Sequence, residues 1–140
     1  MKSIDVARAM LQQGADRLET SVRVIERGNY AYTVRAAQEC VELSLKAVLR
    51  LVGVEYPKQH DVSRVLLTFK ERFPKWFNVE AYAEVSRLLA EKREPAMYGD
   101  ELRMAPAATL FEKADAEDAL GNAKAIHRDC MKLLEGVSKP

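Results

Sequence analysis

The chain has 140 residues, close to the usual size of one domain and long enough to bury a hydrophobic core. Lysine and arginine (22 residues) nearly balance aspartate and glutamate (21), and the net charge of +1 excludes a bulk basic field for nucleic acid, although a local basic patch can coexist with it. We find no signal peptide and no apolar run of membrane-spanning length, so we expect one cytoplasmic domain over residues 1–140 with no membrane contact.

The first predicted element is an amphipathic helix over about residues 4–25. Its apolar residues recur at steps of three and four, at Ile4, Ala7, Leu11, Ala15, Leu18, Val22 and Ile25. Gly28 then suits the left-handed end of a helix, and Asn29 suits the cap of the next one.

The second predicted helix covers about residues 30–52 and carries two apolar stripes. One stripe includes Val34, Val41 and Leu45, and the other includes Cys40 and Ala47. Two apolar faces require neighbours on two sides, so this helix should be central. Gly53 ends it, and a short connection with a proline follows.

A third helix should begin at His60-Asp61, with Asp61 as its cap, and end at Pro74, with Phe73 on its buried face. Trp76 and Phe77 fall in the next connection, where they either cap the core or form an exposed apolar patch. Asn78 should cap a fourth helix that runs to Arg93.

Pro95 should end that fourth helix, because proline lacks a backbone N–H. About twenty residues of ordered loop then lead to Asp115, the expected cap of the last helix. No period-two pattern of useful length occurs. The expected fold is all-α, an antiparallel up-and-down bundle of about five helices.

Two further features of the sequence concern charge and thiols. Residues Arg35, Glu39, Glu42, Lys46 and Arg50 form a polar stripe on the second helix. It is either a solvated face with i,i+4 ion pairs or a set of groups that reaches a site. Cys40 and Cys130 have no metal-ligand spacing, so we expect packed, reduced thiols rather than a disulfide, with no metal and no cofactor.

The segment from Arg93 to Glu101 concentrates functional groups at the end of the fourth helix. Arg93 could hold a phosphate or form an ion pair with Glu91, Glu94 or Asp100. Tyr98 could contact a base or plug the bundle. Asp100 with Glu101 is more typical of a turn and a solvated charge than of a metal site. Lys46 and His60 complete the candidate ligand-binding set, although His60 could simply form a hydrogen bond at a helix start.

The order of these signals resembles the HEPN domain, the "higher eukaryotes and prokaryotes nucleotide-binding" domain. The matching stretches are Asn29-Tyr30, Ala36 to Glu39, Val41 to Leu49, His60 to Val62, and Arg93 to Asp100. The resemblance covers roughly residues 5–135. It implies an antiparallel helical bundle, often a symmetric homodimer, with nucleotide or RNA binding. It also implies a small nucleotidyltransferase partner in a toxin–antitoxin pair.

Many members of that family are metal-independent ribonucleases that carry an arginine followed four to six residues later by a histidine. No histidine follows Arg93 at that spacing, and the histidines present are His60 and His127. We therefore expect no catalytic residues and a non-catalytic nucleotide- or partner-binding protein. The alternative is a ribonuclease toxin whose proton carrier is a non-standard histidine such as His60.

Overall fold

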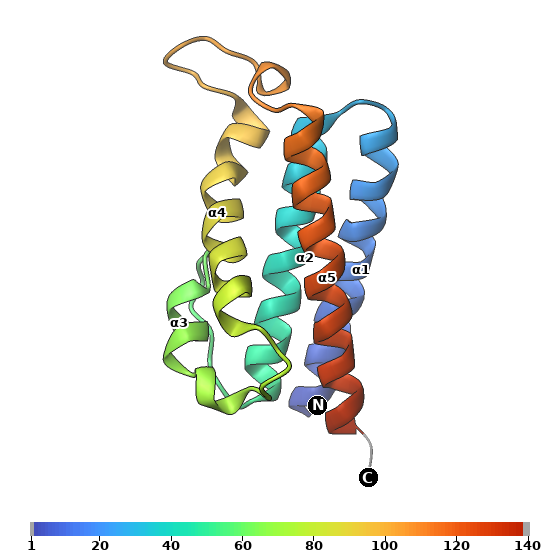
Figure 1. Ribbon diagram of the computed structural model, residues 1–140, viewed down its shortest axis with the longest axis vertical. Coiled ribbons are helices and arrows are strands. Elements are labelled where there is room, and N and C mark those ends of the chain that lie inside the picture. Colours follow the sequence, from blue (N-terminus) through green and yellow to red (C-terminus); the bar gives the residue numbers. More distant parts are fainter. Residues whose placement is uncertain (1, 139–140) are drawn as a thin grey trace.

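The computed structural model describes residues 2–138, which form an all-α bundle (Figure 1). The α-helices are α1 (Ser3–Glu26), α2 (Tyr30–Leu51), α3 (Ser63–Thr68), α4 (Val79–Tyr98) and α5 (Lys113–Ser138). Two 3-10 turns, η1 (Lys70–Arg72) and η2 (Ala107–Thr109), lie in the connections. Within this range the only β-type pairing is an isolated bridge between Asp100 and Ala105. The expected fold class is confirmed.

The central position predicted for α2 is confirmed by its burial and by its neighbours. It packs against α1, α4 and α5, which the ribbon shows around it (Figure 1). Fourteen of its residues are buried, including Val34, Cys40, Val41 and Leu45 at 1% exposure or less. Both apolar stripes are therefore covered, as a helix with neighbours on two sides requires.

Several of the expected helix boundaries are confirmed by their local geometry. Gly28 and Gly53 have φ of +76° and +80°, a backbone conformation that favours glycine. Asn29 and Asn78 accept hydrogen bonds from the backbone N–H of Tyr32 and Ala81, at 3.2 and 3.1 Å, and so cap α2 and α4.

The expected end of the fourth helix at Pro95 is wrong, because α4 continues through Pro95 to Tyr98. An internal proline costs a helix about 3 kcal/mol through its missing N–H and its ring clash. Only one turn follows here, and it is closed by Gly99 N–H donating to the Pro95 carbonyl at 2.9 Å. Ala96 in that turn is buried. This packing keeps the turn helical.

The third helix is much shorter than expected. It begins at Ser63 and ends at Thr68, and the chain continues as η1. Phe73, which precedes Pro74, has extended backbone (ψ 147°) and ends η1. Asp61 is not its N-cap. Its carboxylate instead accepts from Ser63 N–H at 2.8 Å, and the capping position is Val62. Phe73 is buried, although it lies after the helix.

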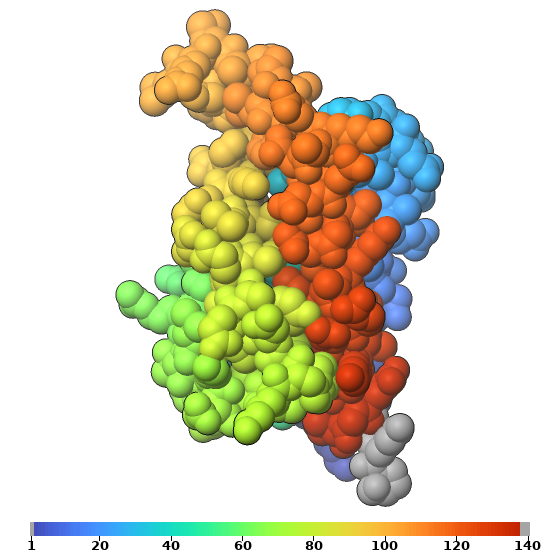
Figure 2. All heavy atoms as spheres, in the orientation of Figure 1, coloured from blue at the N-terminus to red at the C-terminus, as the bar shows by residue number. Residues whose placement is uncertain are grey.

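The last helix begins earlier than expected, and the two aromatic residues of the connection before α4 divide between core and surface. The last helix begins at Lys113, and the Asp115 carboxylate in its first turn accepts from the Glu112 N–H at 2.8 Å. Phe77 is buried against Phe73, with ring centroids 5.1 Å apart, whereas Trp76 is 42% exposed. The α4–α5 connection, orange in Figure 2, projects beyond the bundle.

Candidate functional site: an arginine cluster on the second helix

Three arginine side chains surround the carboxylate of Glu39 on α2. Its Oε1 lies 3.0 Å from Arg17 Nε of α1, and its Oε2 lies 3.2 Å from Arg35 Nε and 3.3 Å from Arg93 Nη1 of α4. We call Arg17, Arg35, Arg93 and Glu39 the arginine cluster. Three positive charges face one negative charge, so the cluster holds a surplus of two positive charges.

The arginine cluster is accessible from solvent. The side chains of Arg17 and Arg35 are 40% and 31% exposed, whereas Glu39 and Arg93 are 22% and 24% exposed. The carboxylate is thus the more covered partner, and two of the guanidinium groups keep donors toward solvent. Partly exposed arginine forks of this kind suit the planar oxygens of phosphate or carboxylate groups.

A hydrogen-bonded path leads from the arginine cluster to two other candidate residues. Arg93 Nη1 donates to Gln38 Oε1 at 2.7 Å, and Gln38 Nε2 donates to Glu42 Oε1 at 2.8 Å. Glu42 also accepts from Lys46 Nζ at 2.9 Å and lies 2.8 Å from His60 Nδ1. Arg93, Lys46 and His60 therefore belong to one polar network.

Glu42 is held ionised within this network. Burial by itself would raise the pKa of Glu42, but hydrogen bonds from Gln38, Lys46 and His60 and the charge on Lys46 lower it below its ordinary value. The charge of Lys46 is balanced by that of Glu42 in their ion pair. The His60 side chain is 55% exposed at the end of the network, with its ring oriented by a carboxylate.

Tyr98 and Asp100 lie outside the polar network. Tyr98 is five residues beyond Arg93 in α4, so the two side chains diverge by about 140° around the helix. It is 62% exposed and lines a pocket of ≈ 720 Å³ with Glu91, Pro95 and Leu110. The Asp100 carboxylate accepts from Arg103 N–H at 3.2 Å, as a turn residue does.

Arg17 belongs to the site, but sequence reasoning missed it. It lies on the polar side of α1, and only the fold brings it to Glu39, 22 residues later. A signal was present in Gly14 in the interior of the first helix, because interior glycines often mark close packing. Gly14 is buried, and a Cβ added there would lie 3.1 Å from the Ser44 hydroxyl of α2.

The remaining reactive side chains, the two cysteines and His127, have structural roles. Cys40 and Cys130 are buried free thiols, and burial raises the pKa of Cys40 to about 12 despite a hydrogen bond with Ser44. His127 Nε2 lies 3.0 Å from the Leu11 carbonyl. In the described part of the chain, no group of three or more His, Cys, Asp or Glu side chains is arranged to hold a metal ion.

The comparisons with known proteins agree with this architecture. The family model of the HEPN domain matches residues 7–134. The crystal structure of TT1696 from Thermus thermophilus is similar, with 27% sequence identity and a TM-score of 0.74 over 90% of this chain and 96% of that one. No curated protein matches significantly. Between residues 2 and 138, none of the helices combines the length and apolarity of a membrane span. The chain therefore belongs to the HEPN domain family.

Proposed function

We propose that this protein is a non-catalytic binding module for a nucleotide, or for a partner protein that carries one. The surplus of two positive charges in the arginine cluster supports this function most directly. Nucleotide phosphates would supply the missing negative charge. The arginine forks would donate to phosphate oxygens while Glu39 keeps the guanidinium groups in place.

The polar network would support this binding rather than perform a reaction. Gln38 is 2% exposed and fixes Arg93 through a hydrogen bond of 2.7 Å, so the guanidinium is positioned before a ligand arrives. Lys46 and His60 both contact Glu42. If a ligand carries a second phosphate, either side chain could exchange its contact with Glu42 for a hydrogen bond to that phosphate. Both residues thus remain in the proposed ligand-binding set.

A thermal-shift screen of nucleotides tests the proposal. Adenine and guanine mono-, di- and triphosphates should raise the melting temperature at constant ionic strength, and more so with more phosphates. The variant Arg35→Gln should lose this response, whereas Arg87→Gln, an exposed arginine of α4 paired with Glu84, should keep it. An absent response for every nucleotide would count against the proposal.

A homodimer is the proposed assembly, and the α4–α5 connection is the proposed contact. Leu102 and Met104 are 98% and 88% exposed at the tip of this connection, which projects from the body (Figure 2). The tip is fixed, because Asp100 N–H and Ala105 N–H each donate to the other's carbonyl, at 2.8 and 2.9 Å. Exposed apolar side chains on an ordered loop mark an interaction surface.

The ≈ 720 Å³ pocket lined by Tyr98 lies beside this tip, and in the proposed dimer it would receive the tip of the other subunit. A twofold interface places the same surface on both subunits, so a tip and an adjacent pocket can pair with the pocket and tip of a second copy. Tyr98 and Asp100 would then contribute to this surface. Sedimentation equilibrium should give two chain masses at micromolar concentration and one for Leu102→Ser/Met104→Ser. One chain mass for the wild type would refute the dimer.

The nucleotide-bearing partner in this proposal is a small nucleotidyltransferase in a toxin–antitoxin-like pair. The arginine cluster supports it, because a nucleotide attached to another protein presents the same phosphates. Co-expression with the product of an adjacent nucleotidyltransferase reading frame should yield a complex that Arg93→Gln weakens. A complex unaffected by Arg93→Gln and by added nucleotide would separate partner binding from the arginine cluster.

The alternative function is a metal-independent ribonuclease, and one observation favours it. His60 is exposed and oriented through Nδ1 by Glu42, as a proton-transferring histidine would be. Purified protein incubated with mixed RNA in EDTA should leave the RNA intact if the binding proposal is right. Cleavage that disappears in both Arg93→Ala and His60→Ala would establish the alternative instead.

A further inference from the structure

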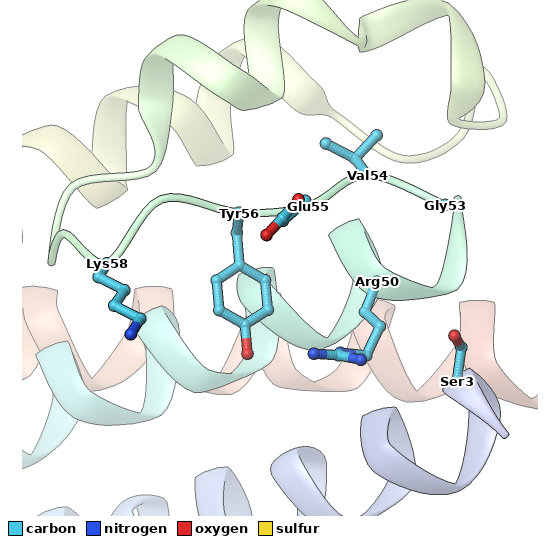
Figure 3. Close-up of a pocket in the computed structure, with 7 residues that line it drawn as sticks. All are labelled: Ser3, Arg50, Gly53, Val54, Glu55, Tyr56 and Lys58. Carbon is cyan, nitrogen blue, oxygen red and sulfur yellow. The ribbon is translucent and has the colours of Figure 1, made fainter. Parts of the chain in front are cut away.

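A second pocket lies at the end of the bundle where α2 terminates, away from the projecting α4–α5 connection. It has a volume of ≈ 470 Å³, and the side chains that line it include Ser3, Arg50, Glu55, Tyr56 and Lys58 (Figure 3). Arg50 follows Glu39 on α2 by three helical turns, so the pocket is about 16 Å from the arginine cluster along the helix axis.

Arg50 is the residue that makes this pocket unusual. Its Nε is buried and has no hydrogen-bond partner, and no carboxylate in residues 2–138 forms an ion pair with it. By contrast, Arg72 across the same connection donates to the carbonyls of Val52 and Gly53, at 3.1 and 3.3 Å. A buried donor of a charged group without an acceptor is unfavourable. The Nε atom is covered, so an anion would bind the terminal guanidinium nitrogens of Arg50, for which no hydrogen bond or ion pair is found among residues 2–138.

Tyr56 holds the Arg50 guanidinium in place. The guanidinium carbon lies 5.8 Å from the centroid of the Tyr56 ring. Lys46 Nζ lies 5.4 Å from the same centroid. The Tyr56 hydroxyl donates to Met10 Sδ at 3.7 Å, which ties the connection to α1. Lys46 forms an ion pair with Glu42, whereas no ion pair involves Arg50 among residues 2–138.

Lys58 and Ser3 add donors to the same pocket. In Figure 3 Tyr56 points from the connection toward the helices, with Arg50 on one side and Lys58 on the other. Lys58 is exposed and, among the described residues, has no ion-pair partner. Glu55 is the one acidic residue of the lining, so the pocket carries two positive charges against one negative charge.

We propose that this pocket binds a small molecule bearing a phosphate or carboxylate group, with Arg50 and Lys58 holding the anion and Ser3 donating its hydroxyl. Glu55 would accept a hydrogen bond from an amine or hydroxyl elsewhere on the same ligand. The volume fits a small metabolite-sized compound rather than a polymer. This site is separate from the arginine cluster and does not depend on the proposed nucleotide binding.

An NMR titration of the full chain tests the proposal, with inorganic phosphate, acetate and phosphoethanolamine as probes and chloride holding the ionic strength constant. Saturable shifts are expected at the Arg50 Nε–H and at the backbone N–H groups of residues 53–56 and Lys58. Phosphoethanolamine should bind more tightly than inorganic phosphate if Glu55 takes the amine. Tighter binding of phosphate or of acetate identifies the preferred anion.

Variants make the result specific to this pocket. Arg50→Gln should weaken binding at least about tenfold, as expected for loss of a charge-assisted donor set, while nucleotide binding at the arginine cluster persists. Lys58→Gln, at a loop position, should weaken it several-fold even if Arg50→Gln fails to fold. Absence of saturable shifts with all three probes, or equal affinity in wild type and Lys58→Gln, would overturn the proposal.

Discussion

Arg93 of α4 and Glu39 of α2 form an ion pair at 3.3 Å across 54 residues of sequence. The same carboxylate accepts from Arg17 of α1, so one side chain joins three helices. This arrangement ties the packing of α4 on α2 to the charge of the candidate site. A change in the arginine cluster should therefore alter both stability and ligand binding.

Removing the Arg93 charge should destabilise the fold modestly. Arg93→Leu leaves Gln38 without its donor at 2.7 Å, and loss of a hydrogen bond to a charged group costs about 1.5–3 kcal/mol. Urea unfolding should show the free energy of unfolding reduced by about 1.5 kcal/mol, the lower end of this range, because Arg93 is 24% exposed. Arg93→Lys should recover part of it, and Arg87→Leu on the exposed face of α4 should change stability by less than about 0.5 kcal/mol.

Glu39→Gln should make the protein depend on added anions. Without the carboxylate, Arg17, Arg35 and Arg93 repel one another, and unfolding free energy should fall by about 1–3 kcal/mol at low salt. Sulfate or phosphate should restore the melting temperature of this variant more than that of the wild type. Glu84→Gln, an exposed carboxylate of α4, serves as the matched control. Equal anion effects on all three proteins would argue against the charge surplus.

Glu42 should make stability depend on pH in the acidic range. Because its pKa is lower in the folded protein than in the unfolded chain, its contribution is present above the ordinary value near 4.5 and is lost as pH falls through the folded pKa. The difference in unfolding free energy between wild type and Glu42→Gln should thus be largest near about pH 7 and shrink below about pH 4.5. The exposed Glu101→Gln variant should show no such trend.

Gly99 should tolerate no side chain. Its φ is +72°, and a Cβ there would lie 2.2 Å from the Ala105 carbonyl oxygen, so the tip of the α4–α5 connection must move. Strain of this kind costs about 1–3 kcal/mol, and Gly99→Ala should lower the melting temperature and weaken dimerisation. Gly121→Ala in α5, where no atom lies within 4 Å of the added Cβ, should be neutral or stabilising.

The parts of the fold that depend on local chemistry could be predicted from sequence. The apolar stripes of α1 and α2 repeat at helical spacing, and Ala7, Leu11, Val34 and Val41 are buried as that spacing requires. The caps at Asn29 and Asn78 follow from side-chain preferences. The i,i+4 pair between Glu42 and Lys46 followed from the same spacing.

The features that depend on tertiary packing could not be predicted. Pro95 reads as a helix end from its local chemistry, but the burial of Ala96 and the closure at Gly99 keep α4 helical to Tyr98. The third helix ends at Thr68, and η1 continues the chain toward Pro74, although no local signal separates the two. Arg17 joins the site through a contact 22 residues away, and no pattern within α1 identifies that partner.

Calorimetric titration of the wild type, Arg93→Gln and Arg50→Gln with a nucleoside triphosphate, at fixed ionic strength, tests whether the arginine cluster is the nucleotide site. If the arginine cluster holds the phosphates, the wild type and Arg50→Gln bind with one site per chain, and Arg93→Gln binds at least about tenfold more weakly. Undetectable binding to the wild type, or unchanged affinity in Arg93→Gln, would contradict the assignment of this cluster as the nucleotide site.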